Sequence, residues 1–207
     1  MNNYKILEQT ETKQGNLIAL FGLSENTNQT LVIGVVHGDE PQGEDLIRRY
    51  LSEYLKENVL FMPALNPDGK INNTRTNSNG VDINRNFPTK NWELTDRDNY
   101  FGGTSPASEI ETKFLVNIID KYKPKAIITL HTPYKIVNYD GPAEELAKQI
   151  SNIINYPVEA SIGYPTPGSF GTFAGIEKNI PTITLEMDEN KSIDNLYKHI
   201  KQIFNML

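Results

Sequence analysis

Short apolar runs alternate along the chain with segments in which apolar residues recur every three or four positions. The runs, rich in β-branched residues, predict strands; they cover residues 16–23, 30–36, 59–65, 125–130 and 181–185. The periodic segments predict helices; the first begins at Pro41, and the others cover residues 106–122, with Ser105 as N-cap, 143–154 and 193–206. Alternating strands and helices predict an α/β fold, a three-layer α/β/α sandwich around a mixed, largely parallel sheet.

Residues 70–106 form a stretch with few apolar positions and many Asn, Thr, Gly and Asp residues. Residues 66–69, Asn-Pro-Asp-Gly, come just before it and predict a turn. A loop of this length in a compact domain is usually functional or disordered. We favour a functional loop because it carries four residues suited to chemistry: Arg75, Asp82, Asn84 and Arg85.

Composition narrows the classes of function. The 207 residues suffice for one domain spanning 1–207, and a net charge of −6 offers no basic field for nucleic acid. There is no cysteine, so a catalytic metal must use histidine and carboxylate ligands. The longest apolar runs have about eight residues, and a membrane span needs about 20. No secretory signal is evident at the N-terminus, so we expect a cytoplasmic protein without a membrane partner.

Three predicted strands lead directly into an ionisable residue. His37 follows the run that ends at Val36, and Glu40 comes three positions later; His131 follows Leu130, and Glu186 follows Leu185. In open α/β sheets, ligands bind at the carboxyl ends of the strands, so these four ionisable residues are expected to converge. The third histidine, His199, lies between Lys198 and Lys201 in the last predicted helix and is expected at the surface.

Two imidazoles and one carboxylate are a catalytic zinc set that leaves one position for water. Zinc lowers the pKa of that water from 15.7 to roughly 7, and Glu186 is placed to take its proton and pass it to a leaving amine. Simpler interpretations exist for single residues. A lone histidine after a strand is more often structural, Glu186 could be a surface or helix-terminal charge, and Arg85 could be an ion-pair partner of Asp82.

The chain resembles the zinc metallocarboxypeptidase (M14) family. The segments that carry the resemblance occur in family order: His37-x-x-Glu40, residues 66–69, Arg75, residues 80–88 with the sequence Gly-Val-Asp-Ile-Asn-Arg-Asn-Phe-Pro, Leu130-His131, and residues 184–186. They extend over most of the chain, and the Asp-x-Asn-Arg-Asn-Phe-Pro stretch is highly specific. The resemblance implies a hydrolase with a single Zn²⁺ ion.

The resemblance also implies a role for each matching residue. His37, Glu40 and His131 would be zinc ligands, and Asp82 would orient the first histidine. Asn84 and Arg85 would bind the terminal carboxylate of the substrate, and Arg75 would stabilise the oxyanion. Glu186 would be the general base, and Tyr164 would be the mobile tyrosine that caps the substrate. The family has a cis peptide after the second zinc histidine, so we expect a cis Thr132–Pro133 bond, which costs only ~0.5–1 kcal/mol before proline.

Within the family, the resemblance is strongest to the bacterial murein peptide amidase A subgroup. The shared features are the short length, the His-Gly-Asp-Glu sequence, and residues 137–143 and 163–169. This subgroup cleaves the γ-D-glutamyl–meso-diaminopimelate bond during cell-wall recycling, which implies a small murein tripeptide as the partner. Asp39 stands where some relatives have a basic or neutral residue, so a side chain that contacts the substrate there would carry a charge of different sign.

Several interpretations stay open. The same zinc set would serve a general carboxypeptidase or an aspartoacylase-like deacylase of N-acyl amino acids. A zinc- or peptide-binding module without catalysis is less favoured, because binding alone requires neither Glu186 nor Arg75. Residues 140–142 are equally consistent with a simple turn. We expect Phe87 and Trp92 to pack the long loop, whereas Phe170 and Thr172 are candidates for the floor of a side-chain pocket.

Overall fold

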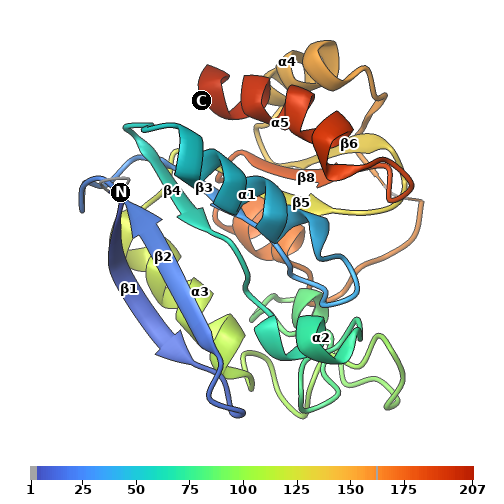
Figure 1. Cartoon of the computed structure of the whole chain (residues 1–207). Helices are drawn as coiled ribbons and strands as arrows, with labels where there is room; N and C mark the ends of the chain where they lie inside the picture. The colour runs from blue at the N-terminus through green and yellow to red at the C-terminus, as the bar shows by residue number, and fades with distance from the viewer. Residues whose placement is uncertain (1–3, 162) are drawn as a thin grey trace.

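The computed structural model describes residues 4–161 and 163–207, which form an eight-stranded sheet with helices on both faces (Figure 1). The strand order is β1-β2-β4-β3-β5-β8-β6-β7. The strands are β1 (Lys5–Glu11), β2 (Leu17–Gly22), β3 (Thr30–Ile33), β4 (Val59–Met62), β5 (Ala126–His131), β6 (Ile136–Asp140), β7 (Val158–Glu159) and β8 (Thr182–Glu186). The central strands β4, β3, β5 and β8 are parallel, whereas β2 and β6 join them in antiparallel pairs.

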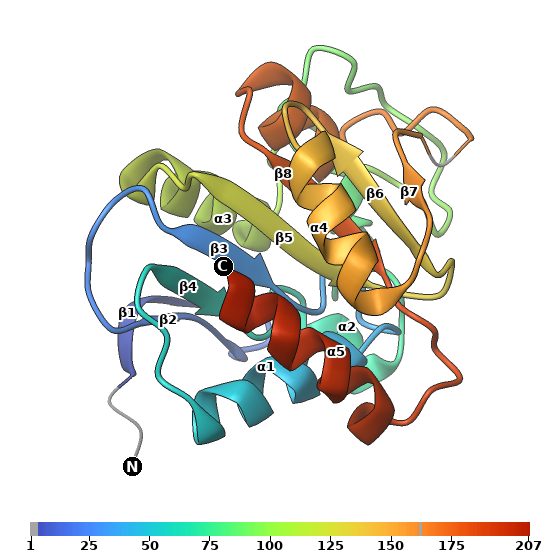
Figure 2. The ribbon, with the colours of Figure 1, turned by 90° about the horizontal axis from the view of Figure 1, so that it is seen from above.

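Helices cover the sheet in two layers. On one face lie α1 (Gln42–Glu53), α4 (Glu144–Ile154) and α5 (Ile193–Met206); on the other lie α3 (Ile110–Tyr122) and the π-helix η2 (Gly171–Glu177) (Figure 2). Two short helices, α2 (Pro67–Asn72) and the 3-10 helix η1 (Ile83–Arg85), interrupt the long polar segment. The expected three-layer α/β/α sandwich with a mixed, largely parallel sheet is confirmed. No helix in the described part of the chain is long and apolar enough to cross a membrane.

The continuous apolar runs arise because both faces of the central strands are buried. Along β3, Val32 faces the cluster formed with α1, α4 and α5, while Leu31 and Ile33 face the cluster formed with α3. Successive side chains of a strand point to opposite faces, so a strand covered on both sides needs apolar residues at every position. Each such side chain stabilises the fold by roughly 1.5–3 kcal/mol relative to exposure.

The strand predicted for residues 30–36 ends earlier, at Ile33. Gly34 lies so close to the neighbouring loop that a Cβ there would be 2.4 Å from the carbonyl oxygen of Pro63. Val35 then has a φ of 50°, outside the strand region. The backbone therefore leaves the ladder after Ile33 and turns toward the edge of the sheet. The strand predicted for residues 59–65 similarly ends at Met62.

The turn predicted at residues 66–69 is wrong, because these residues begin α2. The side chain of Asn66 accepts a hydrogen bond from the backbone N–H of Gly69 at 2.9 Å, and Pro67 occupies the first helical position. Both are favourable at a helix N-terminus, so the same residues that mark turns also start a helix.

The expected start of α3 at Ser105–Pro106 is also wrong. The helix begins at Ile110 because Asn86 holds the preceding segment in an irregular path. The Asn86 side chain donates to the carbonyl oxygen of Ser105 at 3.1 Å and accepts from the backbone N–H of Glu109 at 3.1 Å. The long polar segment is thus tied to α3 by a buried amide. The helices predicted for residues 143–154 and 193–206 are confirmed, the former starting one residue later.

Candidate active site

The strand register brings the predicted site residues to one edge of the sheet. In the parallel pair of β5 and β8, His131 lies opposite Glu186. On the other side of β5, Ile33 of β3 pairs with Thr129, and the turn after Ile33 carries His37 toward the same edge. Residues 94 positions apart, His37 and His131, therefore become neighbours. The expectation that strand ends converge is met.

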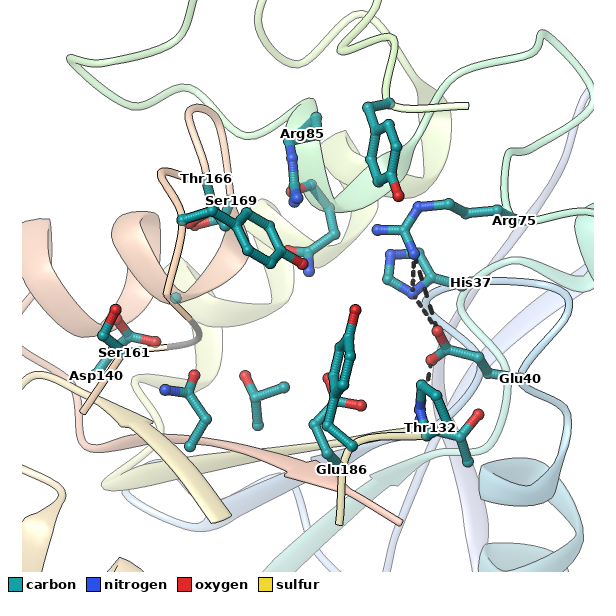
Figure 3. Close-up of a pocket in the computed structure, with 18 of the residues that line it drawn as sticks. His37, Glu40, Arg75, Arg85, Thr132, Asp140, Ser161, Thr166, Ser169 and Glu186 are labelled. Atoms are coloured by element: carbon teal, nitrogen blue, oxygen red, sulfur yellow. Dashed lines mark hydrogen bonds and ion pairs between the residues drawn. The ribbon is translucent and has the colours of Figure 1, made fainter. Parts of the chain in front are cut away.

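His37, Glu40 and His131 form a compact, buried donor set, with all three side-chain donor atoms within 4.8 Å of one another. The Nδ1 atom of His37 lies 2.8 Å from Glu40 Oε1 (Figure 3). The Nδ1 atom of His131 lies 2.8 Å from Glu40 Oε2. The two Nδ1 atoms are 3.2 Å apart. Two imidazole nitrogens and a carboxylate directed at one point are a donor set that fits a zinc ion.

The electrostatics of this cluster favour positive charge. Burial alone would lower the pKa of His37, but the carboxylates of Glu40 and Asp82 raise it to about 9. Burial alone would raise the pKa of Glu40, but the two histidines lower it well below its ordinary value. The carboxylates thus outweigh the cost of burying charge, as a cation site requires.

Asp82 links the histidine cluster to Arg75. Its Oδ1 atom lies 3.4 Å from Nε2 of His37 and accepts a 2.8 Å hydrogen bond from the backbone N–H of Asn84. Its Oδ2 atom accepts from Nε of Arg75 at 2.9 Å. The charges of His37 and Arg75 lower the pKa of Asp82 although its burial is complete. One ionised carboxylate therefore lies between the ring of His37 and the guanidinium of Arg75, and it is hydrogen-bonded to the guanidinium.

The loop that carries His37 and Glu40 packs directly on α2. A Cβ on Gly38 would lie 2.0 Å from the carbonyl carbon of Gly69, so only glycine fits at this contact. The backbone N–H of Gly38 donates to the carbonyl oxygen of Arg75 at 3.4 Å. On the other side, Glu40 Oε2 accepts from the backbone N–H of Thr132 at 3.3 Å. The Thr132–Pro133 bond is cis, as expected.

Glu186 lines the same cavity, across from Arg85 (Figure 3). It is 8% exposed, and its Oε2 atom has no hydrogen-bond partner among the residues that the structure describes. Burial raises the pKa of Glu186, and this effect exceeds the opposing influence of His131. A buried carboxylate with a raised pKa and a free oxygen is suited to proton transfer.

Arg85 and Asn84 reach the cavity, which has a volume of about 340 Å³, from η1. The guanidinium of Arg85 donates to the carbonyl oxygen of Asn84 at 2.7 Å, while Asp82 pairs with Arg75 instead. The interpretation of Arg85 as the ion-pair partner of Asp82 is therefore wrong. Asn84 Oδ1 accepts from the backbone N–H of Phe170 at 2.8 Å, which fixes the amide and leaves its NH₂ group as the donor.

The far end of the cavity contains residues that sequence reasoning did not assign. Asp140, the last residue of β6, lies there with Ser161 and, on the side nearer Arg85, Thr166 and Ser169 (Figure 3). Burial raises the pKa of the Asp140 carboxyl. A Cβ on Gly171 would be 2.1 Å from Asp140 Oδ2, so that glycine leaves room for the carboxylate.

Residues 140–142 were equally consistent with a turn, whereas Asp140 belongs to a strand. Asn138 and Asp140 both line the cavity, whereas the alternate residues Val137 and Tyr139 pack on the core. The alternation of cavity-facing and core-facing residues over 136–140 is the pattern in the sequence that indicates a strand. The pattern is weak because the strand has only five residues.

Tyr164 lies 46% exposed at the cavity mouth, where its hydroxyl pairs with that of Tyr134. Phe170 does not floor the pocket: its ring packs on Phe87 with 5.0 Å between centroids, and the adjacent residues Ser169 and Gly171 line the cavity. Phe87 is fully buried, as expected of a packing residue.

Comparisons with known proteins agree with this geometry. Residues 4–146 match the zinc carboxypeptidase family model. Murein peptide amidase A of Vibrio campbellii is 30% identical over 200 residues, covering 88% of this chain and 79% of the relative. The Escherichia coli K12 protein of the same name is 31% identical over 192 residues, covering 86% and 78% of the two chains.

Solved structures show the same relationship. The murein-tripeptide amidase of Escherichia coli O157 superposes with a TM-score of 0.84 at 26% identity, covering 100% of this chain and 97% of that one. Carboxypeptidase A of Helicoverpa armigera shares the fold, with a TM-score of 0.78 at 15% identity over 99% of this chain and 67% of that one. The chain belongs to the zinc carboxypeptidase family and is a hydrolase with a His-Glu-His cluster that can hold a metal ion.

Proposed function

We propose that the chain is a zinc-dependent amide hydrolase that cleaves next to a free terminal carboxylate. The observation that carries this proposal is that Arg85 is buried without a carboxylate partner among the described residues. It is only 7% exposed, yet it lines the same cavity as His37 and Glu40 of the metal-donor cluster. A buried guanidinium without an anionic partner is costly, and a substrate carboxylate supplies the missing charge.

The residues present fit one zinc ion. Within residues 4–161 and 163–207, His37, Glu40 and His131 are the one group of three or more histidine or carboxylate donors that converges. A bound zinc ion supplies Lewis acidity that activates water near neutral pH. Asp82 holds the His37 ring in the orientation that directs Nδ1 toward Glu40.

The other side chains of the cavity have separate roles in the hydrolysis. Arg85 and the NH₂ group of Asn84 bind the terminal carboxylate, which orients the amide beside it. Glu186 accepts the proton of the attacking water at its free carboxylate oxygen and delivers it to the nitrogen of the leaving amine. Arg75 donates to the oxygen of the scissile carbonyl as negative charge develops there. Tyr164 covers the bound substrate at the mouth.

We further propose the γ-D-glutamyl–meso-diaminopimelate bond of murein tripeptide as the substrate bond. The diaminopimelate side chain ends in both an ammonium group and a carboxylate. Asp140 offers a carboxylate for the ammonium group, and the hydroxyls of Ser161, Thr166 and Ser169 offer donors for the carboxylate. The names of the relatives support the same substrate class. Asp39, exposed at the rim, would disfavour an acidic group there.

The test is hydrolysis by zinc-loaded protein, followed by mass spectrometry. The panel contains L-Ala-γ-D-Glu-meso-Dap, hippuryl amino acids and N-acyl amino acids. Preferred release of diaminopimelate supports the proposal. Preference for hippuryl amino acids would make the chain a general carboxypeptidase, and preference for N-acyl amino acids a deacylase. Zinc binding without turnover of any substrate would refute the enzymatic role and favour a binding module.

A further inference from the structure

Tyr100 lies beside both arginines of the cavity. Its ring centroid is 5.0 Å from Cζ of Arg75 and 5.9 Å from Cζ of Arg85. Both distances lie within the range of a cation–π interaction. Tyr100 is the aromatic residue with cation–π contacts to both guanidinium groups in the described part of the chain.

The backbone around Tyr100 is fixed to the site. Its N–H donates to Asp98 Oδ1 at 2.7 Å, and the next residue, Phe101, is 3% exposed. The carbonyl oxygen of Phe101 accepts a 2.9 Å hydrogen bond from the backbone N–H of Asp82, the residue that binds Arg75. Although Tyr100 is 52% exposed, its backbone is thus fixed next to Asp82 by hydrogen bonds.

The two guanidinium groups carry like charge and reach into one cavity (Figure 3). Asp82 neutralises Arg75, but the contacts of Arg85 give no such fixed partner. The negative face of an aromatic ring attracts each cation and stands in the way of their outward rotation. Tyr100, Arg85 and Tyr164 line both this cavity and a second one of about 390 Å³, which is also lined by Thr95, Pro165 and Pro167. Arg85 therefore already borders open space on that side, and loss of the Tyr100 ring would enlarge it.

We infer that Tyr100 is a positioning residue that keeps Arg85 directed at the substrate carboxylate and Arg75 directed at the scissile carbonyl. This inference rests on the proposed function, in which both arginines bind substrate. Tyr100 acts through its ring face and not through its hydroxyl. It therefore sets how strongly the enzyme prefers a free carboxylate beside the scissile bond.

The experiment compares Tyr100→Leu and Tyr100→Phe on two substrates. One is the murein tripeptide, and the other is the same tripeptide with the carboxylate beside the scissile bond converted into a primary amide. Tyr100→Leu is expected to lower kcat/KM for the acid about fivefold more than for the amide, and Tyr100→Phe is expected to keep the wild-type ratio. Leu94→Ala is the matched control, because Leu94 lies in the same loop, is 67% exposed and lines neither cavity.

A double-mutant cycle with Arg85→Ala separates an effect of Tyr100 on the position of Arg85 from an effect of the size of the Tyr100 side chain. If Tyr100 acts on Arg85, Tyr100→Leu costs less in the Arg85→Ala background than in the wild-type protein. Equal losses on acid and amide would reduce Tyr100 to a cavity wall and overturn the inference, as would an equal loss in Tyr100→Phe. An unchanged preference for the acid in Arg85→Ala would instead refute the proposed role of Arg85. Thermal unfolding verifies that every variant is folded, and Tyr100→Met replaces Tyr100→Leu if that variant is not.

Discussion

Replacing Glu186 with glutamine is expected to abolish turnover while making the protein slightly more stable. The side chain is 8% exposed, and its Oε2 atom has no hydrogen-bond partner among the described residues. Glutamine keeps the shape of the side chain but cannot carry a proton between water and the leaving amine. The substitution therefore separates a functional carboxylate from a structural one.

The two effects have opposite signs and estimable sizes. Positioned general acid–base groups contribute roughly 10²–10⁴-fold to rate. This corresponds to about 2.7–5.5 kcal/mol of activation free energy lost, at 1.36 kcal/mol per tenfold. A buried polar group without a partner costs about 1–3 kcal/mol, and a neutral amide costs less than a carboxylate, so the free energy of unfolding is expected to rise by about 1 kcal/mol.

Three measurements check this prediction: kcat on murein tripeptide, zinc content by elemental analysis, and urea unfolding at pH 7. Zinc content should match the wild-type protein, because Glu186 is not among the three converging donors. Glu145→Gln, an exposed substitution on α4, is the matched control and should change none of the three. A Glu186→Gln variant that keeps more than about a tenth of wild-type kcat would refute the assigned role, and a clear loss of stability would make the carboxylate structural.

Three further substitutions test other parts of the structure. His131→Ala removes one of the three donors and should reduce bound zinc, measured by elemental analysis after dialysis against a fixed free zinc concentration; unchanged zinc content would move the metal site elsewhere. Gly38→Ala places a Cβ 2.0 Å from the carbonyl carbon of Gly69 and should cost at least about 1–3 kcal/mol, measured by thermal unfolding; an unchanged Tm would refute the close contact. Burial and the neighbouring carboxylates raise the pKa of Glu111, so the folded state disfavours the charged form of this side chain. The protonated side chain stabilises the fold at low pH, and this contribution to the free energy of unfolding is lost as pH rises. Glu111→Gln should therefore be more stable than the wild-type protein at pH 7, with the difference in urea unfolding disappearing below about pH 4; the opposite trend with pH would contradict the assigned sign.

The metal cluster could be predicted from sequence because its chemistry coincides with strong local patterns. His37, His131 and Glu186 each come at or just after the end of an apolar run, and parallel strands align their carboxyl ends whatever their order in the sheet. The prediction therefore needed no knowledge of strand order. The same reasoning placed Arg85 near the site and offered Asp82, three positions away, as a possible ion-pair partner, whereas the structure pairs Asp82 with Arg75, seven positions away.

The rest of the cavity depends on contacts between distant segments. Asp140 faces the site because β6 pairs antiparallel with β8, which short strands do not reveal from sequence. The start of α3 was wrong because Asn86, 23 positions before Glu109, binds the segment that local propensity assigned to the helix. Tyr100 has no motif of its own, and its relation to two arginines appears only when the long polar segment is folded. Long-range side-chain hydrogen bonds and ring contacts leave no periodic trace in the chain.

The separation of the metal donors along the chain has a consequence for unfolding. Glu40 and His131 are 91 positions apart, so an ion held by both closes a loop of nearly half the molecule. In a chain without cysteine, such an ion acts as a removable crosslink between β3 and β5, the strands at the centre of the sheet. Because the unfolded chain has no preformed site, the affinity of the proposed zinc ion would be converted directly into resistance to unfolding, by RT ln(1 + [Zn]/Kd). The supply of free zinc would then govern how long the protein survives proteolysis, as well as whether it is active.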